Sequence, residues 1–184
     1  MKWLDRYLQE QRFKKAKQFL RKNDFVLDVG SDDGLLFERF KGFIAGGVGI
    51  EPAAAAMIEK GSYKIIPGYF PDACPQGITF DAIVMLAVLE HIPQETQKKL
   101  AEQCASLLKP SGRIIITVPS PRVDDILKYL RMLRLIDGMH LEEHYGFNHH
   151  DTPSIFKHPS LKLLHHSNFQ LGLNNLFVFE RVNV

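Results

Sequence analysis

Two acidic residues and two glycines stand where a chain could bind a nucleoside. Asp28 lies near the end of an apolar run at 25–29, and Gly30 and Gly34 follow in the loop behind it. Glycine has no Cβ, so a ligand can approach the backbone of such a loop closely. Glu51 ends the next apolar run, and its carboxylate can accept two hydrogen bonds from the hydroxyls of a ribose.

Each feature also has an explanation that needs no ligand. Glycine is common in ordinary turns between a strand and a helix, and the positive end of a following helix stabilises an acid such as Glu51. The glycine loop alone is weak evidence. The loop and Glu51 together favour a nucleoside-binding site.

Histidine is the other residue type suited to chemistry here, because its imidazole exchanges a proton near neutral pH. His91 follows the apolar run at 80–86, and a polar loop from 139 to 150 contains four more histidines. A histidine can act as the general base that a hydroxyl acceptor needs. A metal site built from His140, His144, His149 and His150 is the alternative, but these residues lack a tight ligand spacing, so we expect no metal.

The elements that position these residues alternate between strand and helix signals. This alternation needs right-handed crossovers and predicts an α/β fold with a doubly wound, mostly parallel sheet and helices on both faces. Ligands bind such a sheet at the carboxyl ends of its strands, which is where Gly30, Glu51 and His91 fall. The predicted strands are 25–29, 43–50, 63–66, 80–86 and 113–118, and the predicted helices between them are 35–40, 53–60 and 94–108.

The last third of the chain has a different pattern. Residues 124–136 predict a helix with a basic edge, and a polar loop extends to about residue 159. A helix at 160–166 should precede two strands at 169–173 and 177–181. The pair Asn174-Asn175 between these strands favours a C-terminal antiparallel hairpin.

Bulk properties predict one cytoplasmic domain that spans residues 1–184. The chain has 45% hydrophobic and 24% charged residues, a net charge of +2 and only two cysteines. These values exclude disordered, fibrous and disulfide-rich classes. No apolar run is long enough to span a membrane. A helix over residues 1–22 has a basic face, which is either solvated or in contact with anionic lipid or nucleic acid.

Four segments resemble, in order and spacing, the motifs of one family. The chain is similar to the Rossmann-like (class I) S-adenosylmethionine-dependent methyltransferases of the small-molecule and glycan type. The resemblance implies strand order 3-2-1-4-5-7-6 with strand seven antiparallel. It also implies S-adenosyl-L-methionine as cofactor and a small-molecule, sugar or glycan-precursor acceptor. The segments are 26–34, 49–52, 80–92 and 107–113.

The resemblance assigns roles to individual positions. Asp28 would orient the methionine ammonium group, and Glu51 would bind the ribose hydroxyls. Tyr69 and Phe70 would flank the adenine. The backbone of Leu86 and Ala87 would contact the methionine portion. The full set of cofactor-binding residues is Asp28, Gly30, Ser31, Asp32, Gly34, Glu51, Pro52, Tyr69, Phe70, Leu86 and Ala87.

Some positions depart from the family pattern. Asp32 stands where the family has its central glycine, and Tyr69 replaces the acid that often follows Gly68. Adenine recognition would then depend on backbone groups or on Asp72. The departures motivate an alternative function, a non-catalytic cofactor-binding or interaction module that retains the fold.

The resemblance also places the acceptor side. Relatives insert acceptor-binding segments after the fifth strand, so residues 120–159 should form such an insertion or a lid. His91, His144 and Tyr145 are the predicted catalytic residues, although His91 also belongs to the family pattern and has a structural alternative. No Asn-Pro-Pro-Tyr-type motif follows the fourth strand, which argues against a nucleic-acid base as acceptor. A nicotinamide-dependent dehydrogenase is disfavoured because the loop lacks Gly-x-Gly-x-x-Gly. The sequence does not predict the oligomeric state.

Overall fold

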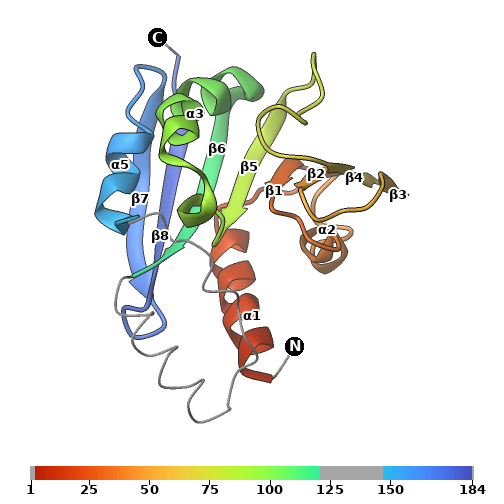
Figure 1. Cartoon of the computed structure of the whole chain (residues 1–184), viewed down its shortest axis with the longest axis horizontal. Coiled ribbons are helices and arrows are strands. Elements are labelled where there is room, and N and C mark those ends of the chain that lie inside the picture. Colours follow the sequence, from red (N-terminus) through yellow and green to blue (C-terminus); the bar gives the residue numbers. More distant parts are fainter. Residues whose placement is uncertain (1–2, 121–146, 184) are drawn as a thin grey trace.

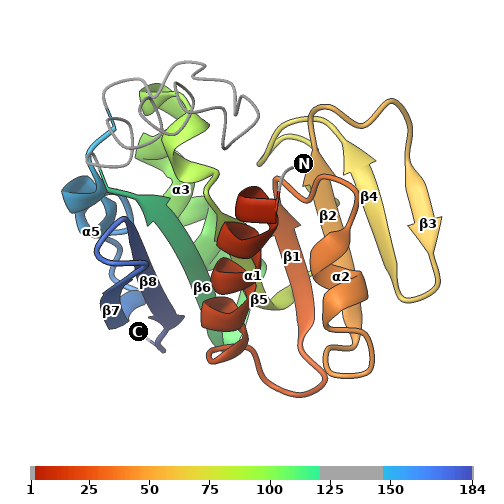
Figure 2. The same ribbon diagram turned by 90° about the horizontal axis from the view of Figure 1, so that it is seen from below.

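The computed structural model describes residues 3–120 and 147–183, which form one eight-stranded sheet with helices on both faces (Figures 1 and 2). The strands are β1 (Phe25–Val29), β2 (Gly46–Glu51), β3 (Ile58–Lys60), β4 (Tyr63–Pro67), β5 (Phe80–Leu86), β6 (Leu108–Pro119), β7 (Leu161–Phe169) and β8 (Asn174–Arg181). The helices are α1 (Trp3–Lys17), α2 (Leu35–Arg39), η1 (Leu89–His91), α3 (Gln94–Leu107), η2 (His149–Asp151) and α5 (Thr152–Ile155).

The strand order confirms the predicted fold and adds one strand. The sheet runs β3-β4-β2-β1-β5-β6-β8-β7. Strands β4, β2, β1, β5 and β6 are parallel, whereas β8 and β7 form an antiparallel hairpin on the β6 side. When β3 is left out and the other seven strands are renumbered along the chain, the order is the expected 3-2-1-4-5-7-6.

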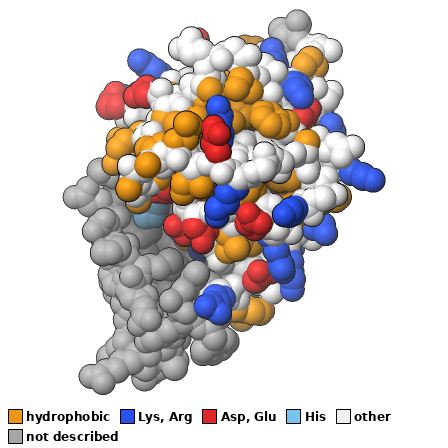
Figure 3. All heavy atoms as spheres, turned by 90° about the vertical axis from the view of Figure 1, so that its right-hand side faces the viewer, with side chains coloured by type: hydrophobic (Ala, Val, Ile, Leu, Met, Phe, Trp, Pro, Cys, Tyr) orange, Lys and Arg blue, Asp and Glu red, His pale blue; other side chains and the backbone are white. Residues whose placement is uncertain are grey.

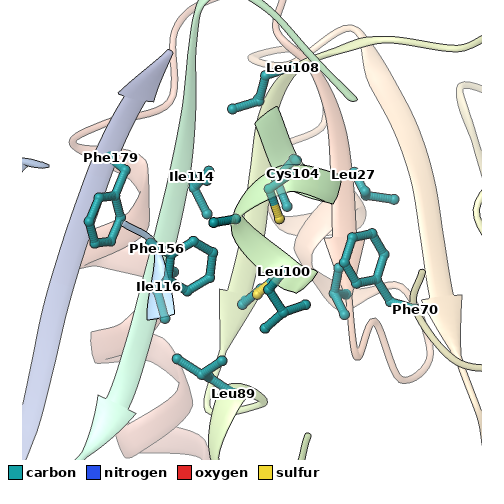
Figure 4. Close-up of a cluster of buried hydrophobic side chains, with 14 of the residues drawn as sticks. Leu27, Phe70, Leu89, Leu100, Cys104, Leu108, Ile114, Ile116, Phe156 and Phe179 are labelled. Atoms are coloured by element: carbon teal, nitrogen blue, oxygen red, sulfur yellow. The ribbon is translucent and has the colours of Figure 1, made fainter. Parts of the chain in front are cut away.

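Two hydrophobic clusters fix the sheet between its helices. Successive side chains of a strand point to opposite faces, so each central strand contributes to both clusters. On one face, α1 and α2 cover Val26, Val84 and Ile115. On the other face, Leu100 and Cys104 of α3 pack between β1 and β6 (Figure 4). The carboxyl ends of the parallel strands are thereby held at one edge.

The predicted helix at 53–60 is wrong. The chain makes turns after β2 and then forms β3, which pairs antiparallel with β4 through Ile58 and Ile65. Alanines favour a helix by propensity, but a short helix is stable only when it buries an apolar face. Residues 55–60 are all exposed, so this segment has no such face.

The predicted end of the chain also needs correction. Residues 160–166 are not a helix, because β7 begins at Leu161 and pairs with β8 along its whole length. The hairpin turn lies at 170–173, where Gln170 and Leu171 have positive φ angles, and not at Asn174-Asn175. Both asparagines are buried inside β8, where pairing with two neighbouring strands satisfies their backbone groups.

Several predictions fall outside the described residues. They include the helix at 124–136, most of the proposed insertion, and the candidates His140, His144 and Tyr145. The N-terminal helix is present as α1, which ends at Lys17 instead of residue 22. None of the helices in residues 3–120 and 147–183 is long and apolar enough to cross a membrane.

Candidate functional site

A cavity of about 910 Å³ opens at the carboxyl ends of β1, β2, β4 and β5. This is the edge at which doubly wound sheets bind ligands. The cavity wall comes from the loops after these four strands and from one face of α3. The lining residues are Val29, Gly30, Ile50, Pro52, Tyr69, Phe70, Pro71, Asp72, Val88, His91, Ile92, Pro93, Glu95, Thr96, Lys99 and Gln103.

The loop after β1 depends on glycine at one position. Gly30 has φ 73°, and its backbone N–H donates to the Ile50 carbonyl over 2.9 Å. A Cβ at Gly30 would lie 2.5 Å from Val88 Cγ2, far inside van der Waals contact. The glycine therefore lets the loops after β1 and β5 approach each other and leaves backbone exposed to the cavity.

Glu51 holds the first loop by both carboxylate oxygens. Oε2 accepts a hydrogen bond from the Asp32 N–H, and Oε1 accepts one from the Ala53 N–H, each over 2.9 Å. Asp32 has φ 48°, the left-handed conformation that the family's glycine adopts without strain. Burial, Asp33 and Glu51 all raise the pKa of the Asp32 carboxyl. Three acidic side chains thus lie close together at the loop after β1.

Asp28 lies beneath this loop as a buried acid. Burial, assisted by the charge of Glu51, raises the pKa of Asp28 to about 8. Its carboxyl is therefore mostly protonated at neutral pH, and a cation beside it would favour ionisation.

A second buried polar group, the Ser31 hydroxyl, has no hydrogen-bond partner in the described part of the chain. It fits only because Gly49 lacks a side chain, since a Cβ there would lie 2.4 Å from Ser31 Oγ. Asp28 and Ser31 thus place two buried polar groups at the end of β1 and in the loop after it.

The predicted cofactor residues fall into two sets. Gly30, Pro52, Tyr69 and Phe70 line the cavity. Tyr69 is 74% exposed at the mouth, whereas Phe70 is 6% exposed and packs into the core, so the two do not form a symmetrical clamp. The others lie beside or behind the cavity wall and do not line it: Asp28, Ser31, Asp32, Gly34, Glu51, Leu86 and Ala87.

Two positions in the second set have clear structural tasks. A Cβ at Gly34 would lie 2.7 Å from the Tyr63 ring, so this glycine allows α2 to start close to β4. Ala87 has φ 59° and donates its N–H to the Thr117 carbonyl over 2.8 Å. That bond turns the chain out of β5 towards η1.

His91 lines the cavity and is exposed to solvent. Its backbone N–H donates to the Val88 carbonyl over 2.9 Å, which closes the turn of η1. The structure therefore brings His91 together with Gly30 and Tyr69. Its catalytic role stays a prediction.

Sequence reasoning missed the wall formed by α3. Glu95, Lys99 and Gln103 recur at intervals of four and therefore lie on one side of the helix, where all three face the cavity. The Oε1 of Gln103 is buried and has no hydrogen-bond partner in the described residues. The spacing of four residues can be read from the sequence. Only the fold shows that this side of α3 faces the cavity at the carboxyl ends of the strands.

Apolar side chains are also exposed on this side of the molecule. Met57 is 57% and Ile58 is 36% exposed at the β3 edge. Figure 3 faces the right-hand side of Figure 1 and shows hydrophobic side chains gathered there.

Within residues 3–120 and 147–183, no group of three or more His, Cys, Asp or Glu side chains is placed to hold a metal ion.

Comparison with known proteins agrees with this geometry. A family model described as a methyltransferase domain matches residues 2–171. Among curated proteins, the ubiquinone biosynthesis O-methyltransferase of Xanthomonas axonopodis pv. citri is 32% identical over 101 residues. That match covers 50% of this chain and 41% of the relative. A second Xanthomonas protein with the same description, from Xanthomonas euvesicatoria pv. vesicatoria, is 31% identical over an equal length.

Solved structures share the fold at low sequence identity. The N-methyltransferase NodS from Bradyrhizobium japonicum, in complex with S-adenosyl-L-homocysteine, has a TM-score of 0.65 at 12% identity and covers 99% of this chain and 89% of its own. The magnesium protoporphyrin IX methyltransferase ChlM from Synechocystis, with the same ligand, has a TM-score of 0.61 at 14% identity, covering 96% and 82%. The chain belongs to the methyltransferase domain family.

Proposed function

We propose that this member of the methyltransferase domain family transfers a methyl group from S-adenosyl-L-methionine to a small-molecule acceptor. The observation that carries the proposal is the cavity at the carboxyl ends of β1, β2 and β4, with the Gly30 backbone in its wall and Glu51 beside it. Its volume of about 910 Å³ lies within the range of cofactor sites.

The residues present fit this cofactor. Asp28 is a buried acid that a neighbouring cation would ionise, which suits the ammonium group of the methionine moiety. Each oxygen of Glu51 accepts one backbone hydrogen bond and retains a lone pair, so its carboxylate can also bind the ribose hydroxyls. The exposed ring of Tyr69 offers a surface for the adenine.

The cofactor supplies, when bound, an electrophilic methyl group on a sulfonium centre. The chain then has to position the acceptor in line with that group and exclude water, and such positioning provides much of the rate enhancement in displacements of this kind. The loops after β1 and β5 approach each other closely at Gly30 and Val88, and together they form one wall of this reaction site.

The acceptor is proposed to be a small molecule, with hydroxyl groups favoured. The ubiquinone biosynthesis O-methyltransferases support an oxygen acceptor, although the match spans less than half of their length. Sugars and glycan precursors belong to the same chemical class. Location in the cytoplasm and the role of residues 120–159 as an acceptor-side insertion are part of this proposal.

Calorimetric titration tests the cofactor assignment. Purified protein is titrated with S-adenosylmethionine, S-adenosylhomocysteine and NAD. Both sulfur nucleosides should bind saturably and NAD should not. Glu51→Ala should weaken binding by about 10- to 100-fold, because it removes a charged hydrogen-bond acceptor. Glu59→Ala, which removes an exposed carboxylate from β3, is the matched control and should bind normally.

The non-catalytic alternative rests on the departures at Asp32 and Tyr69. The Asp32 side chain is exposed and does not line the cavity, so it leaves the cofactor site open, whereas Tyr69 lines the cavity and is 74% exposed. Saturable cofactor binding without any methylated product across hydroxyl and amine acceptors would favour the non-catalytic function. Absence of cofactor binding by folded protein would refute the methyltransferase proposal and favour an interaction module that retains the fold.

A further inference from the structure

A polar cluster lies at the carboxyl end of β6, outside the cavity described above. The Asn175 Nδ2 group donates to Ser120 Oγ over 2.9 Å, and Ser120 Oγ donates to the Gly172 carbonyl over 2.7 Å. His166 Nε2 lies 3.3 Å from Asn175 Oδ1. Because an amide oxygen only accepts, Nε2 of His166 is the donor in this pair. Asn175 and Ser120 are 4% and 8% exposed, so the cluster is built into the sheet.

Two further polar groups of this region are buried without hydrogen-bond partners. His149 in η2 has a buried Nδ1 that makes no hydrogen bond in the described structure. Thr152 at the start of α5 is fully buried, and its Oγ1 also has no partner there. Buried polar atoms in folded proteins are nearly always satisfied, so the His149 nitrogen and the Thr152 hydroxyl need a partner beyond the hydrogen bonds of the described residues, and a bound hydroxyl would supply it.

The cluster shares a sheet face and a sheet edge with His91. The His166 ring stacks on Phe177 at a centroid distance of 4.2 Å, and Phe177 belongs to the same hydrophobic cluster as Leu89 and Ile92 on either side of His91. In addition, η1 contacts β6, and α5 contacts both α3 and η2. Ser120 directly follows the last residue of β6, at the edge where β5 leads into η1.

We propose that His149, Thr152 and the Ser120–Asn175–His166 cluster form a binding site for a hydroxyl-bearing acceptor, with His149 as its general base. A hydroxyl both donates and accepts hydrogen bonds, so it can donate to His149 Nδ1 and accept from Thr152 Oγ1. The inference rests on the methyltransferase function proposed above and adds the residues that bind the acceptor hydroxyl and the base.

The proposed step balances in atoms and charge. The acceptor oxygen forms a bond to the methyl carbon, the carbon–sulfur bond breaks, and its electron pair remains on sulfur as a neutral thioether. The hydroxyl proton moves to His149 Nδ1 and later to solvent. An amine acceptor that is already neutral needs no such base to react, so the requirement for His149 is specific to hydroxyl acceptors.

The surroundings of His149 keep its imidazole neutral. Burial lowers the pKa of His149, and the positive charges that His150 and His166 can acquire lower it further. Asp151 acts in the opposite direction and is outweighed. The His150 ring lies 4.0 Å from the His149 ring. A neutral imidazole at pH 7 has a lone pair free to take a proton.

A binding measurement tests the site without turnover. Protein with ¹⁵N-labelled histidines is saturated with S-adenosylhomocysteine, and the imidazole signals are followed by NMR while catechol or 1,2-diaminobenzene is added. Catechol should shift the His149 and His166 signals saturably, and the diamine should bind at least tenfold more weakly. The signal of His158, which accepts a hydrogen bond from the Ser160 N–H, is the internal control. No saturable shift with catechol, or an equal response to the diamine, overturns the proposal.

Transfer kinetics then separate the base from the cofactor site. With labelled S-adenosylmethionine and catechol, His149→Gln should reduce kcat by about 100-fold or more, within the range for loss of a general base. Its affinity for S-adenosylhomocysteine should not change. His158→Gln should behave as the unmodified chain. Full transfer by His149→Gln overturns the inference. If the unmodified chain does not bind the cofactor at all, the methyltransferase proposal itself is refuted.

Discussion

The two halves of the sheet hold their polar groups in different ways. In the half made of β4, β2 and β1, the site is shaped by backbone: Gly30 donates to Ile50, and Glu51 receives two backbone N–H groups. In the half made of β6, β8 and β7, the polar groups are side chains that bond to one another, as Asn175 does to Ser120.

This difference has consequences for specificity. A site made of backbone groups depends on the conformation of the chain and not on the side chains. Substitution of a glycine that permits this conformation is therefore poorly tolerated in the first half. Side-chain clusters can be rebuilt by substitution without a change of fold. A shared cofactor belongs in the first environment, and an acceptor that differs between relatives belongs in the second.

A loss of both stability and cofactor affinity tests the backbone half. Gly30→Ala places a Cβ 2.5 Å from Val88 Cγ2 at φ 73°. We expect the free energy of unfolding to fall by about 2–4 kcal/mol and cofactor affinity to fall more than tenfold, since strain and overpacking add. Chemical denaturation and calorimetry measure the two effects.

Gly42→Ala provides the matched control for this substitution. Gly42 has φ 78°, but a Cβ there meets nothing within 4 Å. It should cost only the conformational strain of about 1–2 kcal/mol and leave cofactor affinity unchanged. Equal losses for both variants would show that contact with Val88 is unimportant.

The difference between the two halves of the sheet also explains which features could be predicted from the sequence. Asp28, Gly30 and Glu51 are readable because each falls at the end of a short apolar run, and the strand order follows from the alternation of such runs. The helix expected at 53–60 failed because propensity does not show whether a face will be buried. His166, Asn175 and Ser120 come from β7, β8 and the end of β6 and meet only in the folded sheet, so no local pattern marks them.

The second prediction concerns the charge of Asp28. Its pKa is about 8 in the folded chain and 3.8 without the fold, so between these pH values the folded state binds one more proton than the unfolded state. The free energy of unfolding should therefore decrease as the pH rises from 4 to 8, by up to about 1.4 kcal/mol per pH unit. Asp28→Asn should lack this slope and be more stable than the unmodified chain at pH 8.

Cofactor binding should reverse the protonation of Asp28. An ammonium group beside the carboxyl favours its ionised form, so binding at pH 6.5 should release close to one proton. Calorimetry in buffers of different ionisation enthalpy counts the protons. Proton release that persists in Asp28→Asn would assign it to another group.

A smaller effect is expected at Asp32. This residue has φ 48° and lies among the like charges of Asp33 and Glu51. Asp32→Gly should remove both the strain and the repulsion, stabilise the chain by about 1 kcal/mol, and raise affinity for S-adenosylhomocysteine about threefold. Asp32→Asn removes only the charge, so comparing the two variants separates the contributions. A loss of affinity in Asp32→Gly would mean that the carboxylate itself serves the ligand.

The smallest effect belongs to the hairpin of the other half. Where the loop after β1 uses glycine, the turn between β7 and β8 places Leu171 at φ 58° with its side chain fully exposed. Leu171→Gly relieves strain of about 1–2 kcal/mol but makes the unfolded chain more flexible, so a net gain of about 0.5–1 kcal/mol is expected. Leu171→Ala keeps the Cβ and should gain nothing, which separates backbone strain from loss of an exposed apolar side chain. Thermal unfolding of both variants decides the point. If alanine stabilises the chain as much as glycine, the exposed leucine side chain and not backbone strain destabilises this turn. The two halves of the sheet would then differ in their polar groups and not in backbone strain.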